Sequence, residues 1–272
     1  MHKTSTARSI LFVPGNRPER FDKAMAAGAD AVIVDLEDAV PAAEKTFARN
    51  VVSYWLRAAR PVILRINGSR TPWFRDDVAL CSLAGVGGIV LPKAETREEL
   101  AVLNDLATGR PIWPVIETAT GFADAAMLAR APGVERLIFG NVDLQLELGI
   151  TGECEELDYF RSALVLVSRL AGLEAPLDGI CTAIDDTDAL RAETLRNRRF
   201  GYGGKLCIHP RQIAVVNTAY CPSAADIAWA ERVLAAAGAA AGSATTVDGR
   251  MVDQPIVRRA EGILADSRRH PE

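Results

Sequence analysis

The chain has 272 residues, of which 49% are hydrophobic and 24% charged, and its formal net charge is −4. This composition is typical of a globular protein with a substantial core, and it lacks the basic footprint expected of a protein that binds nucleic acid or a membrane surface. No apolar run approaches the ~20 residues of a membrane span, and no secretory leader or CxxC cysteine pair is present, so a cytoplasmic location is expected.

Short apolar segments alternate with segments of helical pattern along the chain. The expected strands are residues 10–13, 31–34, 62–66, 88–91, 112–116, 137–139, 177–181 and 204–208. The expected helices are residues 20–27, 41–58, 96–106, 157–170, 223–237 and 256–264. Eight strands alternating with helices, in a chain close to the ~250 residues typical of the fold, predict an α/β protein with a TIM (β/α)8 barrel.

Acidic residues follow three of the expected strands: Asp35, Glu37 and Asp38 at the second, Glu117 at the fifth and Asp143 at the sixth. A doubly wound open sheet would also explain the alternation of strands and helices. The barrel is preferred because it gathers the ends of nonadjacent strands around one mouth, whereas an open sheet spreads them along an edge.

Carboxylates crowded at one mouth repel each other unless a cation or a proton lies among them. Magnesium prefers one or two carboxylates together with water and substrate oxygens, so Glu117 and Asp143 are the predicted metal ligands. Glu37 and Asp38 are predicted to hold metal-bound water around them, and Asp35 to be structural. The alternative for any single acid is that it caps a helix.

Four cations and one histidine are the other candidates for chemistry. Arg65 lies inside an apolar strand, where a guanidinium needs a partner. An ion pair with one of the acids and a clamp on a substrate carboxylate or enolate oxygen are compatible interpretations, and the clamp is slightly favoured because Arg65 lies near the C-terminal end of the strand. Arg17 lies in a glycine-containing loop that could bind phosphate, although the loop matches no known phosphate fingerprint. Lys93 and Lys205 could form a Schiff base, but a salt bridge is favoured for both, and His209 is expected to be structural.

The segment after the eighth strand is predicted to be a C-terminal helical lid over residues 223–272, after a barrel over residues 1–222. Residues 235–244 contain nothing but Ala, Gly and Ser, which is typical of a helix fraying into a flexible joint. An Asp248-Gly249 turn and a further acid, Asp253, follow on this tail.

The sequence resembles the citrate lyase beta subunit-like CoA-ester lyases of the HpcH/HpaI aldolase superfamily, from residue 8 to about residue 265. Lys45, Ala48 and Arg49 contribute to the resemblance. The other segments that carry it are LFVPGN (11–16), DLEDAV (35–40), LRIN (64–67), LPKAE (91–95), IETATG (116–121), FGNVDL (139–144), GKLCIHP (204–210) and DGRMVDQP (248–255).

The resemblance implies a barrel of the phosphoenolpyruvate/pyruvate type that binds Mg²⁺ and acts on carboxylated 3-hydroxyacyl-CoA esters. Glu117 and Asp143 then match the metal ligands, Glu117 also contacts substrate, and Arg65 matches the substrate-binding arginine. Asp253 matches the catalytic acid of the lid, which relatives contribute across a subunit interface, so a homotrimer or hexamer is expected. Asn141 departs from the small residues usual at its position, and it is expected to affect how the oxo-acid carboxylate is held.

These residues predict a lyase that cleaves citramalyl-, malyl- or citryl-CoA to acetyl-CoA and a 2-oxo acid. The proton would pass between Asp253 and the enolate carbon, while Arg65 stabilises the negative charge on oxygen. The alternatives are a class II aldolase acting on free 2-oxo acids, a malyl-CoA synthase or thioesterase, and the beta subunit of a larger citrate lyase complex.

Overall fold

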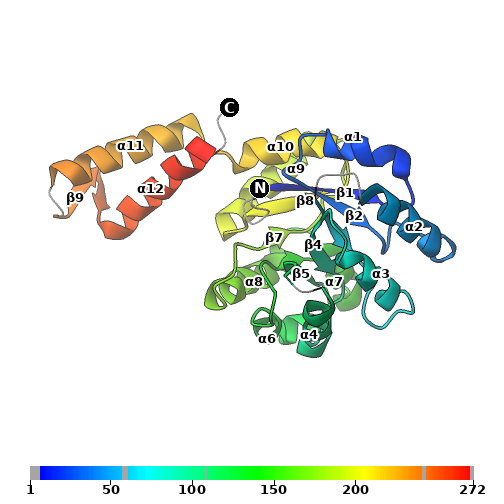
Figure 1. Cartoon of the computed structure of the whole chain (residues 1–272). Coiled ribbons are helices and arrows are strands. Elements are labelled where there is room, and N and C mark those ends of the chain that lie inside the picture. The colour runs from blue at the N-terminus through cyan, green and yellow to red at the C-terminus, as the bar shows by residue number, and fades with distance from the viewer. Residues whose placement is uncertain (1–6, 57–60, 108, 241–242, 270–272) are drawn as a thin grey trace. The chain divides into compact units, whose positions relative to one another are not determined.

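The computed structural model describes residues 7–56, 61–107, 109–240 and 243–269. The chain divides into two compact units, Met1–Asn217 and Thr218–Glu272, called here the barrel unit and the C-terminal unit. In the barrel unit, eight parallel strands close in chain order, which confirms the predicted barrel and excludes the open sheet (Figure 1). The strands are β1 Ser9–Pro14, β2 Ala31–Asp35, β3 Val62–Arg65, β4 Val86–Leu91, β5 Ile112–Ile116, β6 Ile138–Phe139, β7 Leu177–Asp178 and β8 Gly204–Cys207.

Helices surround the barrel and follow most of its strands (Figure 1). They are α1 Phe21–Met25, α2 Lys45–Leu56, α3 Phe74–Cys81, α4 Arg97–Leu106, α5 Ala119–Ala123, α6 Ala125–Leu128, α7 Asn141–Leu148, α8 Asp158–Leu170, α9 Thr187–Phe200 and α10 Arg211–Tyr220. Short 3-10 turns lie at Pro18–Arg20, Ala42–Glu44 and Glu155–Leu157. The predicted helices correspond to α1, α2, α4 and α8, although the last two residues of the predicted 41–58 helix lie outside the described residues.

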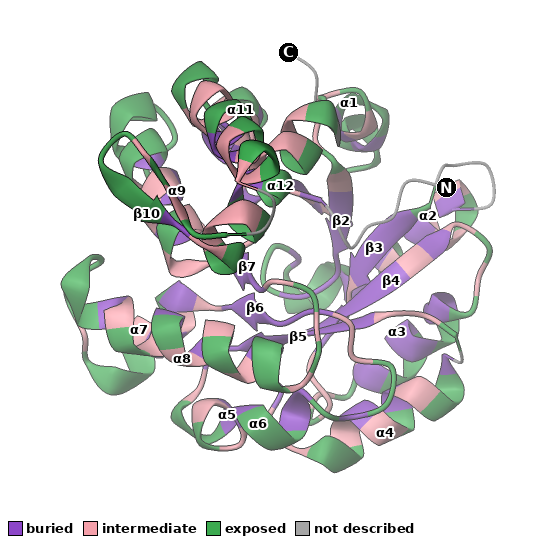
Figure 2. Cartoon of the chain, turned by 90° about the vertical axis from the view of Figure 1, so that its left-hand side faces the viewer, coloured by how far each residue is buried: buried purple, intermediate pink, exposed green. Residues whose placement is uncertain are grey.

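The interior of the barrel is filled by apolar side chains. The residues of the strands are mostly buried, whichever face they point to (Figure 2). This explains why the strands are almost continuously apolar in sequence. Ile33 on β2 and Ile63 on β3 are neighbours in register and both belong to the interior cluster. Because side chains alternate along a strand, Asp35 and Arg65, two residues further on, point to the same side at the carboxyl ends of the strands. The strand register therefore brings an acid and a base together at the mouth.

The described residues of the C-terminal unit form the last residues of α10, the helices α11 Ala224–Ala239 and α12 Gln254–Arg269, and a hairpin of β9 Thr245–Val247 and β10 Arg250–Val252. Its apolar core is formed by Ala230, Val233, Val252 and Ala260. The predicted Asp248-Gly249 turn joins the two strands, and its φ angles of 50° and 73° suit the tight hairpin connection. The hairpin itself was not predicted, and both helices extend beyond their predicted ends. The predicted domain boundary after residue 222 stays a prediction.

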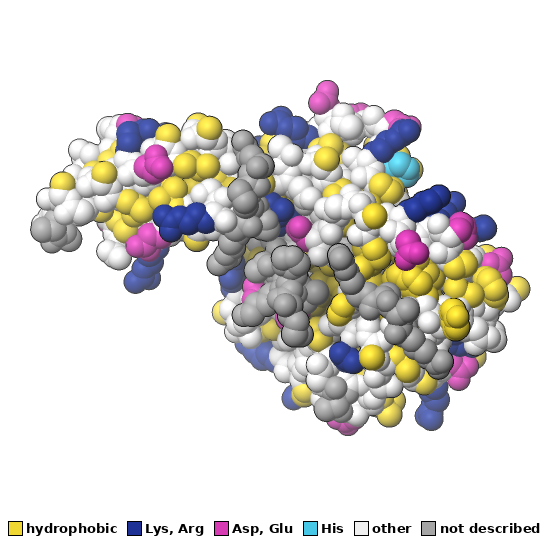
Figure 3. Space-filling view, turned by 45° about the horizontal axis from the view of Figure 1, so that its top comes forward, with side chains coloured by type: hydrophobic (Ala, Val, Ile, Leu, Met, Phe, Trp, Pro, Cys, Tyr) yellow, Lys and Arg dark blue, Asp and Glu magenta, His cyan; other side chains and the backbone are white. Residues whose placement is uncertain are grey.

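The predicted absence of nucleic-acid and membrane partners stays a prediction. Basic and acidic side chains are interspersed on the face shown in Figure 3. Among the described residues, no helix is long and apolar enough to cross a membrane. The five cysteines are all free thiols.

Candidate active site

Asp35 and Arg65 form a bidentate ion pair at the mouth of the barrel. Arg65 donates from Nε and Nη2 to the two carboxylate oxygens of Asp35, at 2.7 and 2.6 Å. The Arg65 guanidinium also lies over the aromatic ring of Phe12, 4.7 Å from the ring centroid. Burial alone would lower the pKa of Arg65, but the charge and hydrogen bonds of Asp35 raise it above its ordinary value. The ion-pair interpretation of Arg65 is thus confirmed, and Asp35 is structural, as predicted.

The loop after β2 is held in place by Asp35 and by the buried Lys45. Asp35 accepts hydrogen bonds from the backbone N–H groups of Glu37 and Ala39, at 2.8 and 3.0 Å. The Lys45 ammonium donates to the carbonyls of Leu36 and Glu37 and to Oδ1 of Asn67, each at 2.7 Å. Burial lowers the pKa of Lys45, while the surrounding carboxylates oppose that shift. The sequence included Lys45 in the family pattern but predicted no role for it.

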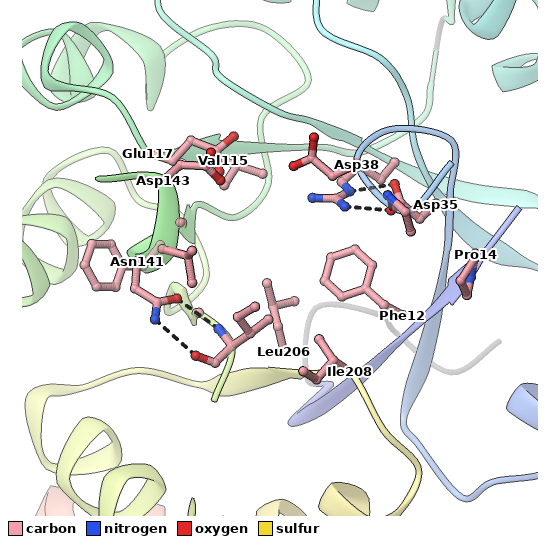
Figure 4. A pocket seen from close by; sticks show the side chains of 17 residues that line it. Phe12, Pro14, Asp35, Asp38, Val115, Glu117, Asn141, Asp143, Leu206 and Ile208 are labelled. Carbon is pink, nitrogen blue, oxygen red and sulfur yellow. Dashed lines mark hydrogen bonds and ion pairs between the residues drawn. The ribbon is translucent and has the colours of Figure 1, made fainter. Parts of the chain in front are cut away.

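Glu117 and Asp143 lie together on one wall of a cavity of about 310 Å³ that opens at this mouth. Figure 4 shows them facing Asp35 and Asp38 across the cavity, with Phe12, Leu206 and Ile208 forming an apolar side. Glu117 follows β5 and is 4% exposed, whereas Asp143 lies in the first turn of α7 with a side chain 38% exposed. Burial first, and the Asp143 charge second, raise the pKa of Glu117 to about 8.

Lys93 contacts carboxylates on both sides of the cavity. Its ammonium donates to Glu37 Oε1 at 2.9 Å and lies 3.9 Å from carboxylate oxygens of both Asp38 and Asp143. Its backbone N–H donates to Glu117 Oε1 at 2.8 Å. Burial would lower the pKa of Lys93, but Glu37 and the other acids raise it above its ordinary value, so the predicted salt bridge is confirmed and a neutral amine for Schiff-base chemistry is disfavoured.

The two carboxylates of Glu117 and Asp143 are chemically suited to bind a magnesium ion. A carboxyl group whose pKa is raised to about 8 by burial and by a second carboxylate is one that a divalent cation would stabilise in its ionised form. Two carboxylates also leave positions open for water and substrate. Among the described residues, no group of three or more His, Cys, Asp or Glu side chains is placed to hold a metal ion, so a metal at this pair would need water or substrate oxygens as further ligands.

Gly140, which the sequence did not single out, allows Glu117 to reach this position. A Cβ at residue 140 would collide with Cβ and Oε2 of Glu117 and with the side chain of Val115. A larger residue would therefore displace the predicted ligand. The glycine next to Asn141 in the FGNVDL segment was the available signal, because glycine marks close approach of a backbone.

Three other predicted site residues have different surroundings. The Asn141 side chain lines the cavity, but its amide exchanges two hydrogen bonds with the backbone of Ile180, at 3.0 and 3.1 Å (Figure 4). Arg17 is exposed and lies outside the residues that line the cavity. Asp253 lies in the C-terminal unit, where its Oδ1 accepts from the backbone N–H of Ile256 at the start of α12. Their roles toward substrate stay predictions.

The remaining candidates outside the cavity have structural partners. The buried Lys205 ammonium donates to Asp178 and Glu193, at 2.6 and 2.9 Å, so its predicted salt bridge is confirmed. His209 Nδ1 accepts from the backbone N–H of Arg211 at 3.2 Å, as expected of a structural histidine.

Comparison with known proteins identifies the family. Residues 8–210 match the model of the HpcH/HpaI aldolase/citrate lyase family. The chain belongs to this family. The prediction of the family and of a lyase is thereby confirmed at the family level. A citrate lyase subunit beta-like protein of Deinococcus radiodurans is 38% identical over 95% of this chain and 96% of its own length. A (3S)-malyl-CoA thioesterase of Cereibacter sphaeroides is 35% identical over 97% of this chain and 95% of its own.

Solved structures of the family show what relatives bind. CitE of Mycobacterium tuberculosis, in complex with magnesium, acetoacetate and coenzyme A, aligns with a TM-score of 0.88 and 34% identity over 97% of this chain and 99% of that one. Other structures of the Mycobacterium protein hold magnesium with pyruvate or with oxaloacetate. The magnesium and CoA predicted from the resemblance thus occur in relatives of the same fold.

Proposed function

We propose that this chain is a magnesium-dependent carbon–carbon lyase that cleaves a carboxylated 3-hydroxyacyl-CoA into acetyl-CoA and a 2-oxo acid. The observation that carries the proposal is the pair of Glu117 and Asp143 in one cavity with a half-buried Arg65 that is held by an ion pair to Asp35. The family and the ligands of its solved members support it. When bound at the acid pair, magnesium would supply a Lewis acid for the substrate oxygens.

The residues of this chain would contribute orientation and charge. Arg65 is held rigidly by Asp35 and Glu37, so it presents a guanidinium that needs no reorganisation to meet a developing oxyanion. Glu117 would contact both substrate and metal. The apolar side of the cavity, formed in part by Phe12 and Leu206, would exclude water from the enolate.

Asp253 is proposed to exchange the proton with the enolate carbon as part of a lid formed by residues 223–272. Its carboxylate is half-buried and caps α12 with one oxygen, which leaves the second oxygen for proton transfer. We also propose the homotrimer or hexamer implied by the resemblance, with this acid contributed to a neighbouring subunit.

The experiment that tests the function uses the purified chain alone, with citramalyl-, malyl- and citryl-CoA, in magnesium and then in EDTA. Acetyl-CoA and the 2-oxo acid should form with magnesium and not with EDTA. Glu117→Gln and Asp143→Asn should each lose at least about a hundredfold in kcat/KM, on the order of the loss of one electrostatic stabiliser. Asp185→Asn, at an exposed ion pair, is the matched control. Turnover that is unaffected by EDTA would refute the proposal.

The cavity favours citramalyl-CoA among the three esters. Arg65 is the single cation among the described residues that line it, and its guanidinium is already paired with Asp35, whereas Leu206 and Ile208 present apolar surface. A methyl group fits such a surface, but a second carboxylate would be buried without a partner. We therefore expect kcat/KM for citryl-CoA to be at least about tenfold lower. Equal values would contradict this preference and leave the lyase activity standing.

Malyl-CoA thioester hydrolysis is a second candidate, favoured by the 35% identical thioesterase of Cereibacter sphaeroides. The products distinguish the two reactions, because hydrolysis of malyl-CoA gives malate and free CoA, while cleavage gives glyoxylate and acetyl-CoA. An aldolase would turn over free 2-oxo acids without CoA, and a citrate lyase subunit would require its complex.

A further inference from the structure

Lys93 lies within 4 Å of four carboxylates: the proposed metal ligands Glu117 and Asp143 and their neighbours Glu37 and Asp38. The ammonium reaches Glu37, Asp38 and Asp143, and the backbone N–H reaches Glu117. Among the described residues, it is the one cation within 4 Å of Asp38 or Asp143. Arg65 forms ion pairs with Asp35 and Glu37.

The backbone of Lys93 is adapted to these contacts. Its φ angle is 49°, in the left-handed region, and Asp248 is the single other non-glycine residue with a positive φ among those described. Left-handed backbone is uncommon for a lysine and is strained. It is compensated here by the hydrogen bond from the Lys93 N–H to Glu117 and by the ammonium contact to Glu37.

The two attachments of Lys93 differ in mobility. The backbone N–H is fixed to the buried Glu117. The ammonium stands on a flexible stem of four carbons, and its side chain is 44% exposed, with one short contact and two at 3.9 Å. The ammonium can therefore leave the acids while the backbone stays in place.

We infer that the Lys93 ammonium is an internal counter-ion, which holds the four carboxylates together before metal binds and competes with magnesium for them. The inference rests on the proposed metal site at Glu117 and Asp143. A positive charge near Asp143 weakens the attraction for a divalent cation, because two cations sharing one group of carboxylates repel each other. Lys93 is accordingly a positioning residue, which keeps the acids ordered at the cost of some metal affinity.

The test compares Lys93→Met with Lys93→Arg and with Lys23→Met, a control that removes one exposed lysine charge elsewhere. Thermal unfolding in EDTA measures the metal-free site, and calorimetric titration with magnesium and with manganese measures metal affinity. Lys93→Met should unfold at a lower temperature in EDTA and yet bind both metals about tenfold more tightly, as expected when a competing charge is removed. Lys93→Arg should resemble the wild type, and Lys23→Met should change neither quantity.

The opposite signs of these two effects separate a counter-ion from a purely structural lysine, whose loss would weaken both stability and metal binding. Metal binding by the wild type with equal or weaker binding by Lys93→Met would overturn the inference and leave the metal site intact. If no variant, including the wild type, bound either metal, the proposed site itself would be wrong, and the inference with it.

Discussion

Replacing Asp35 with asparagine removes the charge that immobilises Arg65 while keeping the size of the side chain. Asp35 is 1% exposed, and its carboxylate accepts four hydrogen bonds, two from Arg65 and two from the backbone of the following loop. An amide retains one acceptor oxygen, and its NH₂ group would face donors, so at least two of the four bonds are lost.

The structure gives the size of the expected effect. Two lost bonds to a charged group, at about 1.5–3 kcal/mol each, predict a fall of about 3–6 kcal/mol in the free energy of unfolding, a range that includes the cost of breaking a buried ion pair. Glu37 still contacts Arg65 in the variant, which favours the lower end, about 3 kcal/mol. For a chain of this size that corresponds to a fall of roughly 6–12 °C in Tm.

Urea unfolding followed by circular dichroism, with magnesium absent, measures this difference. The control is Asp185→Asn, which removes an ion pair to Arg211 whose side chains are both largely exposed, and it should cost less than about 1 kcal/mol. If Asp35→Asn lost no more than this control, the view of Asp35 as the support for Arg65 would be wrong.

Three further predictions concern Glu117, Gly140 and Lys45. Because burial and Asp143 raise the pKa of Glu117 to about 8, above its unfolded value near ~4.3, the metal-free protein should lose stability as the pH rises from about 4.5 to 8. Magnesium binds the ionised carboxylate, so the rise in Tm caused by magnesium should be larger at pH 8 than at pH 6, and Glu117→Gln should abolish that difference; a constant rise would contradict the raised pKa. Gly140→Ala should weaken magnesium binding at least about tenfold by calorimetry, since the new Cβ displaces Glu117; unchanged affinity would show that Glu117 is not the ligand. Lys45→Met should lower the unfolding free energy by about 3 kcal/mol, because three buried acceptors lose their charged donor; a loss under about 1 kcal/mol in urea would contradict its supporting role.

The barrel could be predicted from the sequence because its strands are buried on both faces. Strands such as Ile112–Ile116 are therefore wholly apolar segments in the sequence. Short helices such as α5 and α6 were missed, because four or five residues show no reliable periodicity. The hairpin of the C-terminal unit was missed although its Asp248-Gly249 turn was recognised, since three-residue strands are too short to show alternation.

The acids of the site could be predicted, but their partners could not. Residue type and strand ends identify Glu117 and Asp143, whereas the pairing of Asp35 with Arg65 depends on the register of β2 against β3. The position of Lys93 depends on a left-handed backbone that no local pattern indicates. Lys45 reaches its acceptors from the first turn of α2, nine residues beyond Leu36, and such contacts arise only from tertiary structure.

Arg65 and Lys93 both form ion pairs with the acids of this cavity, but the two side chains differ in how far they are exposed to solvent. The Arg65 side chain is 16% exposed and lies 2.6 Å from the carboxylate of Asp35, which is 1% exposed. Separating the two would leave the buried Asp35 charge with neither a partner nor solvent, which is costly. The Lys93 side chain is 44% exposed, so its ammonium can exchange carboxylates for water at little cost. In the proposed reaction, Arg65 would therefore present a fixed guanidinium to a substrate anion. As the proposed counter-ion, Lys93 would instead supply a replaceable charge, so that the carboxylates stay gathered whether or not a metal ion is bound.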